Sequence, residues 1–116
     1  MEKEISFTRG DTYVIGFTVR ELEGQLDEAY FTCRKDKLRE TPILFQVSLE
    51  DGITYLGDSE YQIVIDSDLT KDIPVGSYFY DLELSKNGSV KTVLKGKLKL
   101  TWDVTGDGNE WYRSGF

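Results

Sequence analysis

Histidine is absent from this 116-residue sequence, and cysteine occurs once, as Cys33. Without histidine the chain lacks the commonest general base and the commonest metal ligand of proteins. A single cysteine cannot form a disulfide within the chain, and it fits a reducing compartment. The carboxylates are numerous but scattered over turns, and no pair stands out as an acid and a base. We therefore expect no catalytic residue, no cofactor-binding residue and no metal ligand, and hence no enzyme.

Long apolar runs and an excess of basic residues are also missing. No stretch approaches the roughly 20 apolar residues that cross a bilayer, and the charged start, residues 1–4, does not read as a signal peptide. The net charge is −7, whereas binding to nucleic acid or to an anionic membrane needs clustered Lys and Arg. These absences predict a protein that is made in the cytoplasm, stays soluble and binds neither nucleic acid nor membrane.

What the sequence does contain is an alternation of apolar and polar residues with period 2, together with fifteen aromatic residues that can fill a core. The alternating segments are 3–8, 12–21, 28–34, 43–49, 53–56, 61–65, 76–85 and 90–103. Turn residues separate them at spacings of about ten residues, which is the pattern of a β-sandwich or barrel. We expect a hairpin turn at Asp51-Gly52, and a crossing connection over 67–75 with one 3₁₀ turn at Leu69. Residues 1–105 then form one domain, followed by a Gly/Asp turn and an aromatic tail over 106–116.

Two apolar rows are expected to pack against each other at the centre of the sandwich. One row contains Tyr13, Ile15, Phe17 and Val19, and the other contains Tyr78, Tyr80, Leu82 and Leu84. In the last hairpin, Leu94, Leu98, Leu100 and Trp102 share a face. A two-residue loop at Asn87-Gly88 would set lysines opposite the tyrosines, because a slip of one residue reverses the faces of a strand. We therefore predict a three-residue loop over 86–88, with Leu94 opposite Tyr80 and Lys91 opposite Glu83.

The segment 72–80 is similar to the tyrosine corner that leads into strand F of immunoglobulin-like domains. In that motif a Tyr hydroxyl, here that of Tyr78, bonds to the backbone a few residues upstream. An ordinary strand aromatic is the alternative, and either role is structural. The fold class that we predict is all-β, an immunoglobulin-like antiparallel β-sandwich of 7–8 strands without a disulfide.

Four further features receive structural interpretations. The tripeptide Arg9-Gly10-Asp11 is interpreted as a turn between strands, not as an adhesion motif. Residues 103–109 match the first half of a calcium loop, but Ser114 stands where a bidentate Glu is required, so we expect a terminal turn. A row of lysines in the last strand is expected to pair with Asp81 and Glu83 on the neighbouring strand: Lys91, Lys95, Lys97 and Lys99. Cys33 is expected to be buried.

The tail carries the residues that we regard as possible assembly contacts, since aromatic residues and Arg are enriched at interface cores. These residues are Trp111, Tyr112, Arg113 and Phe116. Either they fold back onto their own domain, or they form an arm for a neighbouring subunit. Both alternatives remain open at this stage.

The order of the segments 7–12, 76–84, 90–96 and 102–105 resembles the small immunoglobulin-like structural proteins of tailed phages and prophages, including the N-terminal domain of phage upper baseplate proteins. The resemblance covers roughly residues 5–105. It implies a non-enzymatic virion component, synthesised in the bacterial cytoplasm, that binds other tail or baseplate proteins and forms a homo-oligomer. Two alternatives are a carbohydrate- or cell-surface-binding module, which would need an aromatic platform on one sheet, and a calcium-dependent adhesion domain.

Overall fold

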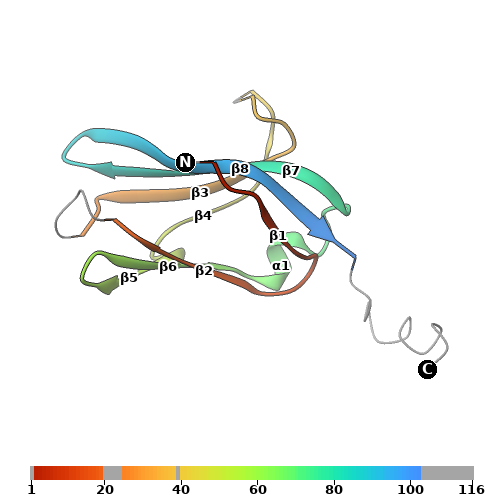
Figure 1. The fold of residues 1–116 in the computed structure, drawn as a ribbon, viewed down its shortest axis with the longest axis horizontal. Coiled ribbons are helices and arrows are strands. Elements are labelled where there is room, and N and C mark those ends of the chain that lie inside the picture. Colours follow the sequence, from red (N-terminus) through yellow and green to blue (C-terminus); the bar gives the residue numbers. More distant parts are fainter. Residues whose placement is uncertain (1, 20–24, 39, 103–116) are drawn as a thin grey trace.

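The computed structural model describes residues 2–19, 25–38 and 40–102. Within these residues, eight strands and one short helix follow one another (Figure 1). The elements are β1 (Ile5–Thr8), β2 (Tyr13–Thr18), β3 (Glu28–Arg34), β4 (Ile43–Leu49), β5 (Gly52–Gly57), β6 (Glu60–Ile65), α1 (Ser67–Thr70), β7 (Gly76–Lys86) and β8 (Ser89–Thr101). No helix in these described ranges is long and apolar enough to cross a membrane.

The strands form two layers that are joined at one place. Their order is β1-β8-β7-β3-β4-β5-β6-β2, and the link between β4 and β5 consists of only two residue pairs. The larger layer is therefore β1-β8-β7-β3-β4, and the smaller is β5-β6-β2 (Figure 1). These layers correspond to the G-F-C-C′ and D-E-B sheets of a variable-type immunoglobulin domain. The predicted immunoglobulin-like β-sandwich is confirmed. Not every strand pair is antiparallel, because β1 pairs with β8 and β4 pairs with β5 in parallel.

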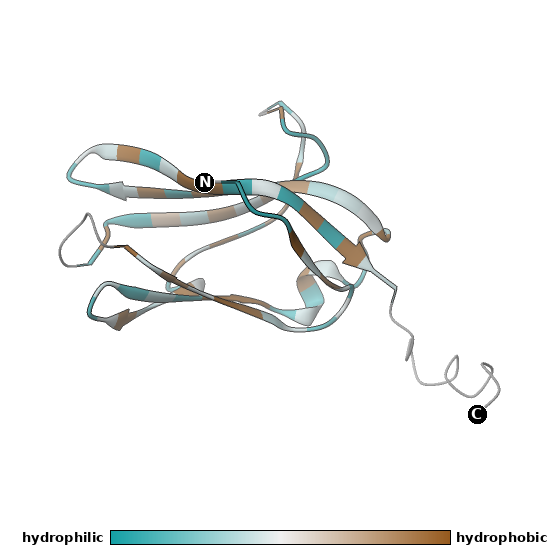
Figure 2. Ribbon diagram, in the orientation of Figure 1, coloured by the Kyte–Doolittle hydropathy of each residue, from teal (hydrophilic) through white to brown (hydrophobic). Residues whose placement is uncertain are grey.

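Alternation of side chains along each strand builds the core between the layers, and Figure 2 shows this alternation along β8. Phe31 of β3 is fully buried, and its ring stacks on Tyr80 with centroids 5.0 Å apart and on Phe45 at 6.3 Å. Antibody domains place a Trp and a disulfide in this region. In this protein the rings of Phe31, Tyr80 and Phe45 stack along the inner face of the larger layer. A ring contact across the layers joins Phe7 of β1 to Tyr13 of β2, with centroids 4.5 Å apart.

The two central rows are buried to different degrees. Tyr78, Tyr80, Leu82 and Leu84 are all buried, as predicted. In β2, by contrast, Tyr13, Ile15 and Phe17 are only partly buried. Trp102 was expected on the same face as Leu98 and Leu100, but it is 73% exposed. The reason is that it follows the end of β8 and lies beyond the last core residue.

The β7–β8 hairpin differs from the prediction in its loop. Lys86 pairs with Ser89 across a two-residue turn at Asn87-Gly88, where φ is 53° and 81°. Positive φ at both positions is the signature of a type I′ turn, which matches the twist of a hairpin. The predicted three-residue loop is therefore wrong.

A bulge farther along the hairpin removes the conflict that had argued against the short loop. Glu83 faces Thr92 and Leu82 faces Leu94, so that Val93 is one extra residue on β8. The extra residue reverses the parity of the rest of the strand, which brings Leu98 opposite Tyr78 and keeps lysines out of the core.

The same bulge splits the predicted row of lysines. Lys95 faces Asp81, as part of the expected charge pairing, and Lys97 and Lys99 share its side of the sheet. Lys91 lies opposite the buried Leu84 instead of Glu83, and thus on the other side. The expectation of one continuous row of four lysines is wrong for this reason.

The expected hairpin at Asp51-Gly52 is also wrong. Here β4 and β5 meet in a short parallel register, Ser48 with Gly52 and Leu49 with Ile53, where the chain crosses between layers. Left-handed φ angles at Glu50 (66°) and Gly52 (107°) make the crossing possible. The hairpin of this region is β5–β6, which turns at Asp58-Ser59, where both residues have positive φ.

Side-chain hydrogen bonds fasten the connections between strands. The Tyr78 hydroxyl donates to the Pro74 carbonyl at 2.5 Å, which is the bond of a tyrosine corner. The buried Thr70 hydroxyl of α1 accepts the N–H of Gly10 at 2.9 Å, so the Arg9-Gly10-Asp11 turn is held against the domain. The Tyr61 hydroxyl accepts the Leu26 N–H at 2.9 Å and ties the segment before β3 to β6.

Alkaline solution is expected to destabilise this core. Burial raises the pKa of the Cys33 thiol from 9.0 to about 12, and burial followed by the nearby Tyr13 raises the pKa of Tyr80 from 10.0 to about 12. The unfolded chain ionises first, so the stability that is fully present below about pH 9 is lost as the pH rises toward 12. Urea unfolding as a function of pH measures this loss. The fall should be shallower in Tyr80→Phe, and an equal slope would contradict the assignment of Tyr80.

Candidate functional site

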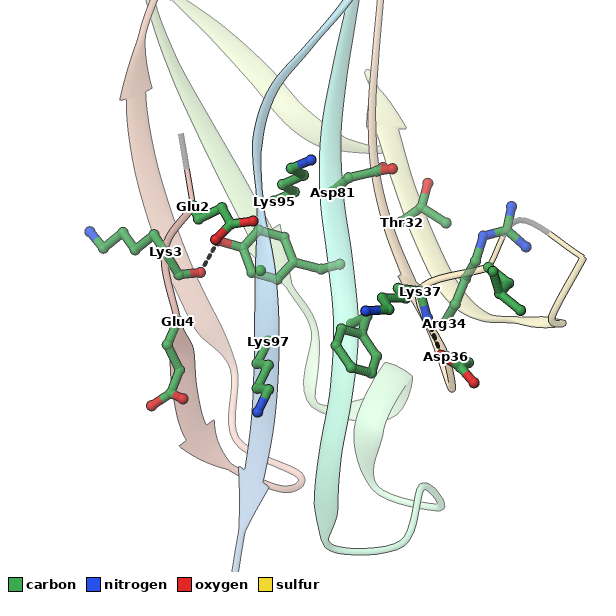
Figure 3. Close-up of a pocket in the computed structure, with 14 residues that line it drawn as sticks. Glu2, Lys3, Glu4, Thr32, Arg34, Asp36, Lys37, Asp81, Lys95 and Lys97 are labelled. Carbon is green, nitrogen blue, oxygen red and sulfur yellow. Dashed lines mark hydrogen bonds between the residues drawn. The ribbon is translucent and has the colours of Figure 1, made fainter.

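The outer face of the larger layer is hollowed by a continuous groove. Two adjoining hollows, of about 720 and 610 Å³, share Thr32, Arg34 and Asp81 in their lining. Strands β8, β7 and β3 form the floor, the segment Glu2–Glu4 forms one wall, and the start of the β3–β4 connection forms the other (Figure 3). We call this feature the outer groove.

The register of the strands places three side chains of the outer groove in one row. Phe79 of β7 lies opposite Lys97 of β8 on one side and opposite Arg34 of β3 on the other. The Phe79 side chain points to the outer face of the sheet, because successive side chains alternate between the faces and its neighbours Tyr78 and Tyr80 are buried in the core. An aromatic ring between two cations therefore marks this end of the groove.

The other end of the outer groove is acidic and polar. Asp81 lies between Lys95 and Thr32, and Glu83 lies opposite Tyr30. The Tyr30 hydroxyl donates to Glu28 Oε2 at 3.2 Å. This hydrogen bond and the negative charge of Glu28 raise the pKa of Tyr30. Cations thus flank Phe79 at one end of the groove floor, and Asp81 and Glu83 add carboxylates at the other.

The first wall is held in place by backbone contacts. The Lys3 N–H donates to the Lys95 carbonyl at 2.9 Å, and the Tyr80 hydroxyl donates to the Lys3 carbonyl at 2.6 Å. Gly96 makes this approach possible, because a Cβ at that position would lie 2.3 Å from the Lys3 carbonyl oxygen. Glu4, in the same wall, forms an ion pair with Lys99 at 3.4 Å.

The second wall is a short connection that bonds mainly to itself. Arg34 Nη1 donates to the Thr41 carbonyl at 2.5 Å, and the Thr41 hydroxyl bonds to the carbonyl of Leu38 at 2.6 Å. The Lys37 N–H is capped by Asp36 Oδ1 at 2.7 Å. The Leu38 side chain is 57% exposed, so this wall adds an apolar contact beside the cations.

The outer groove is suited to recognition by charge and packing. No ion pair of Lys97 is found within the described part of the chain, so its ammonium can meet a carboxylate of a partner. The exposed part of Phe79 can pack against an apolar or aromatic group. Residues 2–19, 25–38 and 40–102 contain no cluster of three or more His, Cys, Asp or Glu that could hold a metal ion.

The predicted site residues and this groove do not coincide. Tyr78 makes its corner bond inside the domain, while Trp111, Tyr112, Arg113 and Phe116, like the half calcium loop at 103–109, lie outside the described residues. Sequence reasoning did not identify Phe79 or Arg34, and it assigned Lys97 to a row of charge-paired lysines. The available signal was Phe79 itself, since an aromatic residue at an outward position of an alternating strand has no role in the core.

Replacing Gly96 tests how the first wall is held. In Gly96→Ala the new Cβ collides with the Lys3 backbone, so we expect residues 2–4 to be displaced and the unfolding free energy to fall by about 1–3 kcal/mol. Gly16→Ala is the control, because its Cβ would meet only the Tyr61 carbonyl oxygen at 3.9 Å. Urea denaturation gives both values. Equal stabilities for the two variants would contradict the close approach at Gly96.

Comparisons with known proteins agree on the fold. A scan against models of protein families finds no match, and neither does a search of curated protein sequences. Among solved structures, the endo-β-1,4-mannanase from Thermotoga petrophila is similar with a TM-score of 0.58 and 16% identity, over 86% of this chain and 18% of the mannanase chain. The NK cell receptor NKp44 is similar with a TM-score of 0.51 and 13% identity, over 87% of this chain and 99% of the receptor chain.

These likenesses define a class. The protein is an immunoglobulin-like β-sandwich, and it spans less than a fifth of the mannanase chain. At such low identities the likeness concerns the fold alone, and one fold carries many functions.

Proposed function

We propose that this chain is a non-enzymatic structural domain of a tailed-phage or prophage particle, where it joins other tail or baseplate proteins through the outer groove. The observation that carries the proposal is the row in which Phe79 lies between Lys97 and Arg34 on an open sheet face. Aromatic residues and Arg are enriched at the energetic centres of protein interfaces. The resemblance of segments 7–12, 76–84, 90–96 and 102–105 to small immunoglobulin-like structural proteins of phages supplies the setting.

The chemistry of the groove defines the partner segment. An extended segment that presents an apolar or aromatic side chain next to a carboxylate would meet Phe79 and Lys97 together. A basic side chain farther along the same segment would reach Asp81 and Glu83. Such a segment belongs to another tail or baseplate protein in this proposal, and the domain is a virion component made in the bacterial cytoplasm that also associates with copies of itself.

Incorporation into particles tests the proposal. Particles produced from a genome that encodes the tagged wild-type chain are purified on a density gradient, and the chain is expected to band with them. Phe79→Ala combined with Lys97→Glu should reduce incorporation by about tenfold or more, as expected for loss of an interface centre. Thr54→Ala, an exposed change in the smaller layer, is the control. Wild-type chain that remains wholly in the soluble fraction would contradict a virion role.

A carbohydrate-binding module is the second candidate, and one observation favours it. Tyr30 and Phe79 both point outward on the layer that carries the outer groove, so two aromatic side chains line one face. Sugars stack on such rings. Saturable glycan binding that is lost in Phe79→Ala and Tyr30→Ala, with no incorporation into particles, would select this function instead.

A further inference from the structure

Strand β2 forms an open edge of the smaller layer. It pairs with β6 through six residue pairs, from Tyr13 with Ile65 to Thr18 with Glu60. In the described ranges of the chain no strand pairs with its other side. Figure 1 shows β2 beside β6 in the layer that also contains β5.

The core is incompletely covered along this edge. The inward residues of β6, Tyr61, Ile63 and Ile65, are at most 1% exposed, whereas those of β2, Tyr13, Ile15 and Phe17, are only partly buried. The outward Val14 is 50% exposed. Apolar surface is thus left uncovered on both faces of the edge, where one more strand would cover it.

Strand β2 also lacks the protection that edge strands usually carry. Charged residues make up 30% of the whole sequence, but the six residues of β2 contain neither a charge nor a proline. Edge strands of monomeric proteins are commonly short or interrupted by Lys or Pro, because an unprotected edge pairs with other chains. β1, the edge of the other layer, has only four residues, and β4 starts directly after Pro42.

The phase of the β2–β6 ladder fixes which backbone groups are available at this edge. Antiparallel ladders alternate hydrogen-bonded and non-hydrogen-bonded pairs. The Val19 N–H, in continuation of β2, donates to the Ser59 carbonyl at 2.9 Å, so the residues with the same parity, Tyr13, Ile15 and Phe17, direct their backbone groups toward β6. Val14, Gly16 and Thr18 therefore direct theirs outward, to the open edge.

We propose that two copies of this protein associate through β2, edge to edge and antiparallel, to form a six-stranded sheet β5-β6-β2-β2-β6-β5 across a two-fold axis. A second copy fits because the edge is uncharged, so that two chains of net charge −7 bring no like charges together within the paired strands. The proposed pairing involves the β2 edge alone. It requires neither the phage setting nor the outer groove, which lies on the other layer.

One register satisfies both the backbone and the side chains. If Ile15 faces Ile15 of the second copy, then Val14 faces Gly16, and both have outward backbone groups that can bond. The same register sets Tyr13 opposite Phe17 of the second copy, twice, so that the partly buried rows of both copies join into one core. Aromatic pairs across strands are favourable. A register shifted by one step along each strand would set Gly16 against Gly16 and lose these pairs.

Blocking the edge without disturbing the domain is the first test. Gly16→Pro removes an N–H that points away from β6, and its Cβ position has room, since the nearest neighbour is the Tyr61 carbonyl oxygen at 3.9 Å. Val14→Lys places charges at the proposed contact. Thr54→Lys makes the same charge change at an exposed position of the same layer. Sedimentation equilibrium should give a wild-type dimer whose dissociation constant rises about tenfold or more in the first two variants and stays unchanged in Thr54→Lys.

Cross-linking tests the register. In a non-hydrogen-bonded antiparallel pair the Cα atoms are about 4.5 Å apart, within the span of a disulfide. Ile15→Cys is therefore expected to give a disulfide-linked dimer on oxidation, whereas Thr54→Cys is expected to stay monomeric. A non-reducing gel distinguishes the two outcomes. The native Cys33 is fully buried and can be kept. Circular dichroism confirms that each variant is folded.

The other outcomes overturn the proposal. A wild-type chain that is monomeric at every concentration excludes β2 self-pairing, even if a strand peptide from another protein binds the edge. A dimer that survives Gly16→Pro and Val14→Lys uses another surface. A dimer that is lost only when residues 103–116 are removed is held by the tail and not by β2.

Discussion

Phe31→Ala is expected to lower the free energy of unfolding by about 3–5 kcal/mol, close to the limit for a single core residue. Phe31 is fully buried, and its ring contacts Tyr80 and Phe45 of the neighbouring strands. Truncation to Ala removes the transfer energy of a ring and leaves a cavity between layers that have no disulfide to hold them. Urea denaturation followed by tryptophan fluorescence and far-UV circular dichroism measures the change.

A graded series separates the size of the ring from its position. Phe31→Leu keeps most of the volume and should cost under about 1.5 kcal/mol. Val90→Ala changes a residue that is 63% exposed on the β7–β8 hairpin and should be nearly neutral. A cost for Phe31→Ala as small as that for Val90→Ala would contradict a major contribution of the buried Phe31 ring to the core.

Gly52→Ala is expected to cost about 3 kcal/mol, because two effects act on one residue. The added Cβ would lie 2.7 Å from the Cβ of the buried Val47, and Gly52 has a φ of +107°, which disfavours any residue with a Cβ. The crossing from β4 to β5 connects the two layers here, so the displacement falls on the link between them. Urea denaturation measures the loss.

Gly57→Ala is the matched control for this prediction. Gly57 also has a positive φ (+94°), but a Cβ there would meet nothing within 4 Å. It should therefore show only the backbone part, about 1 kcal/mol. In Gly52→Ala, a further Val47→Ala change should cost less than the same change in the wild-type chain, since the two sites share the same space. Additive costs would contradict a direct collision.

The sequence allowed most strands to be located because their pattern is local. The alternation in 28–34 and 76–85 placed Phe31, Cys33, Tyr80 and Leu82 inside, and all four are buried. The tyrosine-corner segment was recognisable because the hydroxyl of Tyr78 and its acceptor, the Pro74 carbonyl, are only four residues apart. Such features depend on neighbours in the sequence, and the sequence contains them.

The errors arose where the structure depends on counting residues across two strands. The bulge at Val93 shifts the pairing of β7 with β8. No Gly or other residue typical of a bulge stands at Val93, so the sequence does not indicate the extra residue. Asp51-Gly52 suits a hairpin and a crossing between layers equally well, because both need a positive φ. The outer groove was not predicted because Arg34, Phe79 and Lys97 come from three separate segments and meet only through the register of the sheet.

The parallel pairing of β1 with β8 determines how this domain would carry a mechanical load. Because both strands run in the same direction, from Ile5 beside Leu98 to Thr8 beside Thr101, the chain enters at one pole of the pair and leaves at the other. Tension applied to the N-terminal end of β1 and the C-terminal end of β8 would slide the two strands along each other. The hydrogen bonds between these strands, together with the bond between Lys3 and Lys95, would then resist at the same time instead of opening in succession.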